Sequence, residues 1–104
     1  MSNKTRLCTT DEVTDDEPLC VNLEGFPSLA VYEIEGEYFV TDNLCTHGNA
    51  LLTDGYQEGD EIECPFHGGA FSIKTGEPTA FPCQIAIKSY PVIVENNEVF
   101  IESE

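Results

Sequence analysis

Both histidines of the chain lie close to a cysteine. The 104-residue sequence contains only two histidines, and they occur as Cys45-x-His47 and, after a spacer of sixteen residues, as Cys64-x-x-His67. Thiolate and imidazole are good ligands for borderline and soft metals. A lone cysteine usually behaves as a small hydrophobe, but this does not explain why every histidine is paired with one. The spacing therefore predicts a metal site with Cys45, His47, Cys64 and His67 as its ligands.

Two kinds of metal site fit this ligand set. Structural zinc takes four Cys or His ligands, but zinc sites usually group like ligands together with at least two residues between them. Here each pair is mixed, and Cys45 and His47 are separated by one residue. Mixed pairs suit two adjacent iron atoms, because each loop can send its cysteine to one iron and its histidine to the other. The pattern favours a two-iron two-sulfur cluster, with a zinc-stapled interaction module as an alternative.

The segments CTHGNALLTDG (45–55) and CPFHGGAFSIKTGEP (64–78) resemble the ligand loops of the Rieske family. In length and composition the chain resembles the small Rieske-type 2Fe-2S ferredoxins of bacterial aromatic-ring-hydroxylating dioxygenase systems. The resemblance implies one Rieske 2Fe-2S cluster, with Cys45 and Cys64 on one iron and His47 and His67 on the other. Two ferric ions, two sulfides, two thiolates and two neutral imidazoles sum to zero charge, so one added electron makes the cluster negative.

The resemblance also implies a function. The chain would be a one-electron carrier between a flavin-containing NAD(P)H-dependent ferredoxin reductase and a terminal ring-hydroxylating oxygenase. It would not be an enzyme itself, because an oxygenase iron needs two further histidines and a carboxylate, and both histidines are already used. A small Rieske subunit of the nitrite reductase type is an alternative. The aromatic substrate is not indicated, since this component would not touch it.

Strand patterns dominate the rest of the sequence. Leu29–Asp42 reads as a hairpin around Glu35-Gly36-Glu37, and Tyr90–Ser103 as a second hairpin with Asn96-Asn97 at its turn. Further strand candidates are residues 5–10, 18–23, 70–73 and 85–92. The acidic stretch Thr9 to Pro18 predicts a loop with a helical turn capped by Thr10 or Asp11. No long helical periodicity is present, so the sequence predicts an all-β domain of antiparallel sheets, and the resemblance implies the Rieske fold.

The length of the chain predicts one domain over residues 1–104. By resemblance, a basal β part (about 1–42 and 84–104) supports a cluster-binding subdomain (about 43–83), which we expect to be built from loops. Six of the eight glycines lie between Asp42 and Pro82, where they allow tight loops. A loop containing Pro82 would cover the cluster, and Leu51, Phe66 and Phe81 would screen it from water. Three cysteines lack a histidine partner: Cys8 and Cys20 read as inert strand cysteines, and Cys83 as a neighbour of the cluster rather than a ligand.

The composition is strongly acidic. Twenty Asp and Glu face four Lys and Arg, which gives a formal net charge of −16. Nucleic acid and anionic membranes both need a basic face, so neither is expected as a partner. Docking on basic patches of the reductase and oxygenase is expected instead. No secretory signal and no apolar stretch of membrane-spanning length are seen, so we expect the protein in the cytoplasm. We also expect it to be a monomer.

Four positions bear on the reduction potential. High-potential Rieske proteins of respiratory bc-type complexes carry two extra cysteines that form a disulfide, and the matching positions here are Ala50 and Phe66. Those proteins also place a serine and a tyrosine after the second histidine ligand, where this chain has Gly69 and Phe71. Fewer hydrogen-bond donors mean less stabilisation of the reduced state. The resemblance thus predicts a potential near the low end of the Rieske range.

Overall fold

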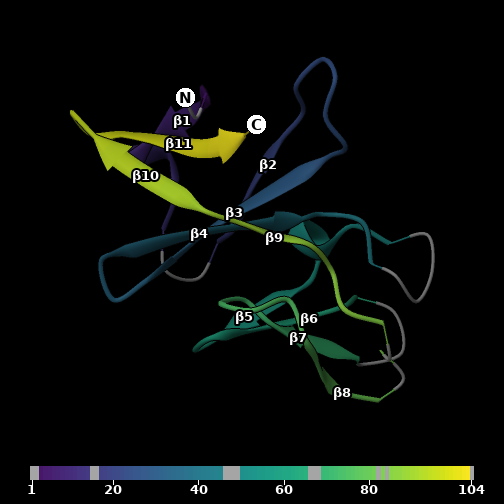
Figure 1. Ribbon diagram of the computed structural model, residues 1–104. Coiled ribbons are helices and arrows are strands. Elements are labelled where there is room, and N and C mark those ends of the chain that lie inside the picture. The colour runs from purple at the N-terminus through teal and green to yellow at the C-terminus, as the bar shows by residue number, and fades with distance from the viewer. Residues whose placement is uncertain are drawn as a thin grey trace.

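The computed structural model shows three antiparallel β-sheets (Figure 1). It describes residues 3–14, 17–45, 50–65, 69–81, 83 and 85–103. Within these residues the only helices are two short 3-10 turns, and none is long and apolar enough to cross a membrane. The prediction of an all-β fold with antiparallel sheets is confirmed.

The middle sheet has the strand order β2-β3-β4-β9, with bounds Leu19–Val21, Leu29–Ile34, Glu37–Asp42 and Ser89–Tyr90. The predicted β3–β4 hairpin is confirmed, and its two turn residues Glu35 and Gly36 have φ of 50° and 85°. Positive φ at both central residues is typical of the turn that matches strand twist. The predicted strand over 85–92 is wrong in its first half. Residues 85–88 belong to no strand, and the Ile87 N–H donates instead to the carbonyl of Gly76, eleven residues earlier in the chain.

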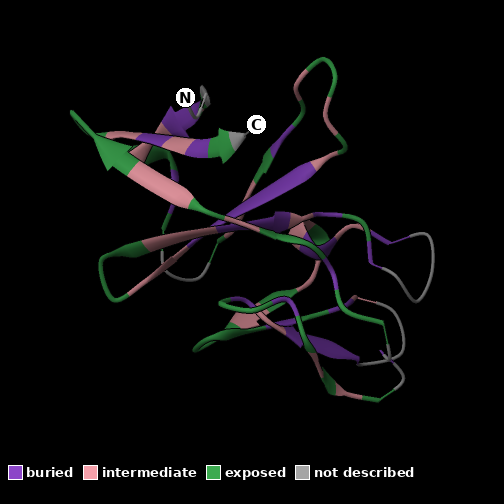
Figure 2. Cartoon of the chain, viewed as in Figure 1, coloured by how far each residue is buried: buried purple, intermediate pink, exposed green. Residues whose placement is uncertain are grey.

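Strand β3 separates two hydrophobic cores. Its residues Leu29, Ala30, Val31 and Tyr32 are all fully buried (Figure 2). Because successive side chains of a strand point to opposite faces, Ala30 and Tyr32 pack into one core while Leu29 and Val31 pack into the other. We call these the Tyr32 core and the Val31 core. A strand buried on both faces explains the uninterrupted apolar run in the sequence.

The Val31 core is closed by the sheet β1-β11-β10, with bounds Asn3–Thr9, Glu98–Ser103 and Val92–Glu95. The predicted hairpin turn at Asn96 and Asn97 is confirmed, with φ of 51° and 63°. The helical turn predicted in the acidic stretch is a 3-10 turn, Thr10–Glu12, but its predicted cap is wrong. Thr9 is the capping residue, because its backbone N–H donates to Glu12 Oε1 at 2.9 Å.

The Tyr32 core is closed by the sheet β5-β6-β7-β8, with bounds Tyr56–Glu58, Glu61–Glu63, Ala70–Ser72 and Pro78–Ala80. A short 3-10 turn, Leu52–Asp54, precedes it. We expected one strand over 70–73 and otherwise loops in this segment. The strand is confirmed as β7, and the expectation of loops is wrong for β5, β6 and β8. Each has three residues, too few for a recognisable alternation, and the fully buried Ile62 and Phe71 hold the sheet against the core.

Gly76 lies between β7 and β8, and its backbone is in contact with the segment that leads into β9. It has a φ of +82°, and a Cβ added there would lie 2.1 Å from the carbonyl oxygen of Ile87. We expect Gly76→Ala to destabilise the protein by more than about 2 kcal/mol, from the positive φ and the backbone clash together. At about 4–8 °C per kcal/mol for a domain of this size, the thermal midpoint should fall by roughly 10 °C.

The matched control for Gly76→Ala is Gly59→Ala. Gly59 also has a positive φ of +61°, but an added Cβ would meet nothing within 4 Å. Its cost should stay near 1 kcal/mol, from the backbone conformation alone. Thermal unfolding of both cofactor-loaded variants checks the comparison. Equal losses would show that the approach of Ile87 to Gly76 is unimportant for stability.

Candidate metal centre

The first predicted ligand loop leaves the middle sheet at the end of β4. Leu44 forms a bridge with Leu51, and the Cys45 N–H donates to the Ala50 carbonyl at 2.9 Å. These contacts close the loop on itself and place Cys45, which is 2% exposed, in the Tyr32 core. His47 lies outside the described residues.

Asn43 fastens the base of this loop. Its side chain is fully buried, and Nδ2 donates to Ser28 Oγ at 3.1 Å and to Thr53 Oγ1 at 3.0 Å. Its Oδ1 accepts the Thr53 backbone N–H at 2.9 Å. The amide thereby ties both ends of the first loop to the segment before β3. The sequence analysis missed this residue, because an asparagine before a turn has no pattern that distinguishes a buried amide from an exposed one.

The second predicted ligand loop follows β6. The Cys64 N–H donates to the Gly69 carbonyl at 2.7 Å, so this loop also returns on itself, and Cys64 is 2% exposed. Gly55 lies so close to this strand end that an added Cβ would stand 1.9 Å from the Glu63 carbonyl oxygen. The close backbone approach fixes the two loops relative to each other. His67 lies outside the described residues.

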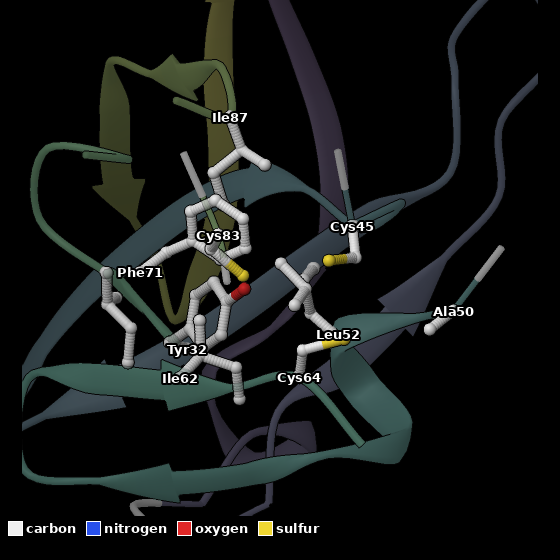
Figure 3. Packing of buried hydrophobic residues seen from close by; sticks show 11 residues of the cluster. Tyr32, Cys45, Ala50, Leu52, Ile62, Cys64, Phe71, Cys83 and Ile87 are labelled. Atoms are coloured by element: carbon white, nitrogen blue, oxygen red, sulfur yellow. The ribbon is translucent and has the colours of Figure 1, made fainter. Parts of the chain in front are cut away.

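A third loop brings another cysteine to the same place. Cys83 is 5% exposed and belongs, with Cys45 and Cys64, to the Tyr32 core. Figure 3 shows the Cys83 side chain in this core together with those of Cys45 and Cys64. Burial first, and then the neighbouring Cys45 and Cys64, raise the pKa of the Cys83 thiol well above its usual value. The expectation that Cys83 lies near the predicted ligands is confirmed for the two cysteines.

The other two cysteines lie elsewhere. Cys8 is buried in the Val31 core, where burial and then Glu12 raise its pKa to about 11, so the thiol keeps its proton. Cys20 is exposed on β2, where its sulfur accepts a hydrogen bond from Asn22. Both are strand residues, as predicted, and neither belongs to the core that contains Cys45 and Cys64.

Apolar side chains near the loops are more exposed than expected. Leu51 is half-buried, but Phe81 is 79% exposed, so the prediction that Phe81 screens the site from water is wrong. The loop that contains Phe81 turns back through a hydrogen bond from the Cys83 N–H to the Ala80 carbonyl, which leaves the ring on the outer side. Leu44 and Ile85 are also exposed. Phe66 and Pro82 lie outside the described residues.

The two described candidate ligands, Cys45 and Cys64, fit an iron–sulfur cluster. None of the five cysteines forms a disulfide, so Cys45 and Cys64 can both serve as metal ligands in one enclosed core. Within the ranges described, no three His, Cys, Asp or Glu side chains are arranged to hold a single metal ion. Two thiolates from two closed loops match the cysteine half of a cluster in which imidazoles supply the other half.

The basic residues of the chain all have intramolecular partners. Lys4 pairs with Glu95 and Arg6 with Glu98 on the sheet β1-β11-β10. Lys88 lies 4.8 Å from the ring centroid of Tyr90, and Lys74 lies 5.9 Å from that of Phe39. Only two of these positive charges are paired with carboxylates, and the net charge is negative because 20 acidic residues outnumber four basic ones.

Comparison with known families gives a match over residues 3–91 to the model described as Rieske [2Fe-2S] domain. Among curated relatives, the ferredoxin component of a naphthalene 1,2-dioxygenase system of Pseudomonas putida is 50% identical over 91 residues, covering 88% of this chain and 86% of the relative. The ferredoxin component of a p-cumate 2,3-dioxygenase system from the same species is 44% identical over 97 residues, covering 92% and 82%.

Solved structures agree with these relatives. Sphingomonas yanoikuyae B1 ferredoxin superposes with a TM-score of 0.95 at 62% identity, covering 98% of this chain and 100% of that one. The ferredoxin in a complex of reduced oxygenase and oxidized ferredoxin of carbazole 1,9a-dioxygenase gives a TM-score of 0.88 at 38% identity, covering 94% and 91%. Together with the two buried cysteines in closed loops, these matches show that the chain belongs to the Rieske [2Fe-2S] family.

Proposed function

We propose that this protein is a one-electron carrier of an aromatic-ring-hydroxylating dioxygenase system, with Cys45, His47, Cys64 and His67 as the ligands of one Rieske cluster. The observation that carries the proposal is the pair of buried cysteines, neither of them in a disulfide, that two separate loops bring into one core. When bound, the cluster supplies a centre that accepts and releases one electron. The protein residues exclude water from the cysteine side, while the sequence spacing assigns the histidines to the other iron.

We propose a division of the chain into a basal β part (about 1–42 and 84–104) and a cluster-binding subdomain (about 43–83) within one domain. The sheet β5-β6-β7-β8 and both ligand loops fall in the second segment. The two other sheets fall in the first, which supports the division. Strand β3 lies between the two cores and gives the ligand loops a rigid base.

The proposed partners are a flavoprotein ferredoxin reductase and a terminal oxygenase component, which the protein would meet as a monomer in the cytoplasm. The relatives are ferredoxin components of dioxygenase systems, and one similar ferredoxin was solved together with its oxygenase. Around the proposed site, Leu44, Phe81 and Ile85 offer exposed apolar surface for docking. The surplus of carboxylates favours basic patches on both partners.

Two alternatives have less support. A putative nitrite reductase small subunit shares the fold with a TM-score of 0.80, but at 22% identity this likeness concerns the fold alone. A zinc-stapled module would place its four ligands around one ion, and the family match is to a 2Fe-2S domain instead. This component would not contact the substrate of the oxygenase.

The carrier function is tested by anaerobic reduction with NADH and a flavoprotein reductase from a dioxygenase system, followed as bleaching of the visible absorption. Since carboxylates steer the encounter, we expect the second-order rate to fall about tenfold between low salt and 0.5 M salt. Dithionite is the control. It is an anion, so salt should speed its reaction with this acidic protein. A reductase rate that stays flat across the salt range would contradict steering, and no reduction at all would contradict the carrier function.

A further inference from the structure

Asn43 uses every polar group it has to join three segments of the chain. Its backbone N–H donates to the Ser28 carbonyl at 2.9 Å, and its carbonyl accepts the Leu52 N–H at 2.7 Å. The side chain reaches the same two segments through the bonds to Ser28 Oγ, Thr53 Oγ1 and the Thr53 N–H described above. Cys20 Sγ, 3.4 Å from Nδ2, is a third and weaker acceptor. Asn43 is fully buried, so water does not replace these bonds.

The two ligand loops differ in what holds their ends. The second loop runs from β6 to β7, two adjacent strands of one sheet, so a ladder of backbone hydrogen bonds holds both of its ends. The first loop starts after β4 but returns into the 3-10 turn Leu52–Asp54, which belongs to none of the three sheets. Leu52 is buried in the Tyr32 core with Cys45 (Figure 3), but an apolar contact is non-directional. The hydrogen bonds to Asn43 thus tie the returning end of the first loop to the middle sheet.

An amide suits this position because one short side chain both accepts and donates. Without it, the buried Thr53 N–H would have no side-chain acceptor, and an unpaired buried donor costs more free energy than its bond contributes. The returning end could then leave the sheet, and the loop would open on the side of Cys45 alone. Local opening of this kind does not need the Val31 core to unfold, because proteins open in separate cooperative units.

We propose that Asn43 is the positioning residue of the first ligand loop: its buried amide keeps Cys45 at the cluster, and without it iron is lost by local opening rather than by unfolding. Asn43 acts through Cys45 and is not a ligand, and the proposal rests on the ligand assignment made above. Cys64, whose loop is held by two paired strands, stays in place in either case.

The first experiment measures iron release from the oxidised, cluster-loaded protein to a chelator, at temperatures equally far below the unfolding midpoint of each variant. Asn43→Leu removes the amide at similar volume and should speed release about tenfold or more, as expected for a buried N–H left unpaired. Thr53→Val removes one hydroxyl acceptor but keeps the backbone bond, so we expect a smaller increase. Val99→Ala is the matched control. It removes buried volume from the Val31 core, on the other face of β3, and should release iron at the wild-type rate.

Two outcomes of this comparison would overturn the proposal. One is a wild-type release rate in loaded Asn43→Leu. The other is an equal increase in Val99→Ala, because iron would then leave through general loosening of the fold. Where Asn43→Leu takes up no cluster, Thr53→Val carries the test, and a wild-type rate there would contradict the proposal. Iron and sulfide analysis of the wild type keeps the two proposals apart. Absence of a 2Fe-2S cluster there refutes the carrier function, whereas a normal cluster without any effect of the amide refutes only the role of Asn43.

The second experiment reads a spectroscopic signature that a purely structural role would not change. A Cys45 that is held less firmly occupies a spread of positions, so the g-values of the reduced cluster should also spread. We therefore expect the frozen-solution EPR lines of Asn43→Leu to be broader than those of the wild type, and those of Val99→Ala to keep the wild-type width. Unchanged lines in Asn43→Leu would show that the amide does not position Cys45.

Discussion

Replacing His47 or His67 by alanine is expected to abolish the Rieske centre. Wild-type protein should contain about two irons and two acid-labile sulfides per chain, as the cluster type requires. Each alanine variant removes one of four ligands from a site in which imidazole cannot be supplied by another residue, since the chain has no third histidine. Iron and sulfide content should fall to a small fraction of the wild-type value, and the visible and EPR spectra of the reduced centre should be lost. Cys45→Ser and Cys64→Ser should do the same.

The controls for the ligand variants are Cys8→Ser and Cys20→Ser. Cys20 is exposed, and Cys8 lies in the Val31 core on the other face of β3, so neither change should alter the spectrum. Full cluster content in either histidine variant would refute the ligand assignment. Stoichiometric zinc without labile sulfide in the wild type would favour the zinc-stapled module instead.

The second large expected effect concerns the reduction potential. We expect a midpoint near the low end of the Rieske range, on the order of −150 mV. Gly69 and Phe71 have no side-chain donor, so the negative charge of the reduced cluster is stabilised less than in high-potential relatives. Both residues are buried next to the second ligand loop, and Phe71 lies in the same core as Cys64.

Adding donors should raise the potential. We expect Gly69→Ser and Phe71→Tyr each to shift the midpoint upward, and the double variant to shift it further. Phe71 is fully buried, so a new hydroxyl there also needs an acceptor, and thermal unfolding of the loaded variant monitors that cost. Voltammetry of the wild type decides the main point. A midpoint well above zero, toward the upper part of the range, would show that these missing donors do not control the potential.

The low potential fits the proposed place in electron transfer. A carrier reduced through a flavin from NAD(P)H can work at a low potential, whereas a carrier that accepts electrons from quinol needs a high one. Ala50, at a position that matches a disulfide cysteine of the high-potential proteins, is buried in the Tyr32 core with Cys45. An alanine there fills the space without a covalent link between the loops.

Local sequence determined the longer hairpins. The turns at Glu35-Gly36 and Asn96-Asn97 were predictable because Gly36 and the two asparagines tolerate positive φ and the flanking strands are long enough to show apolar patterning. Of the four three-residue strands, β7 lies within the strand predicted over 70–73. Strands β5, β6 and β8 were not predictable, since such short runs look like loops until they are seen pairing with one another. The strand expected over 85–88 failed because Ile87 is bonded across to Gly76, a contact that no local pattern encodes.

For the candidate site, the sequence by itself determined the donor types. A Cys-x-His pair and a Cys-x-x-His pair predict the kind of metal centre, because few metals accept that ligand set. The spacing between the pairs assigns them to two loops. The tertiary structure decided what surrounds the two cysteines. It packed Cys45 and Cys64 into one core, brought Cys83 to them from a third loop, fastened the first loop through Asn43 and left Phe81 outside. These contacts are between residues far apart in the chain, so they form only on folding. Burial of the Tyr32 core then offsets the loss of chain entropy.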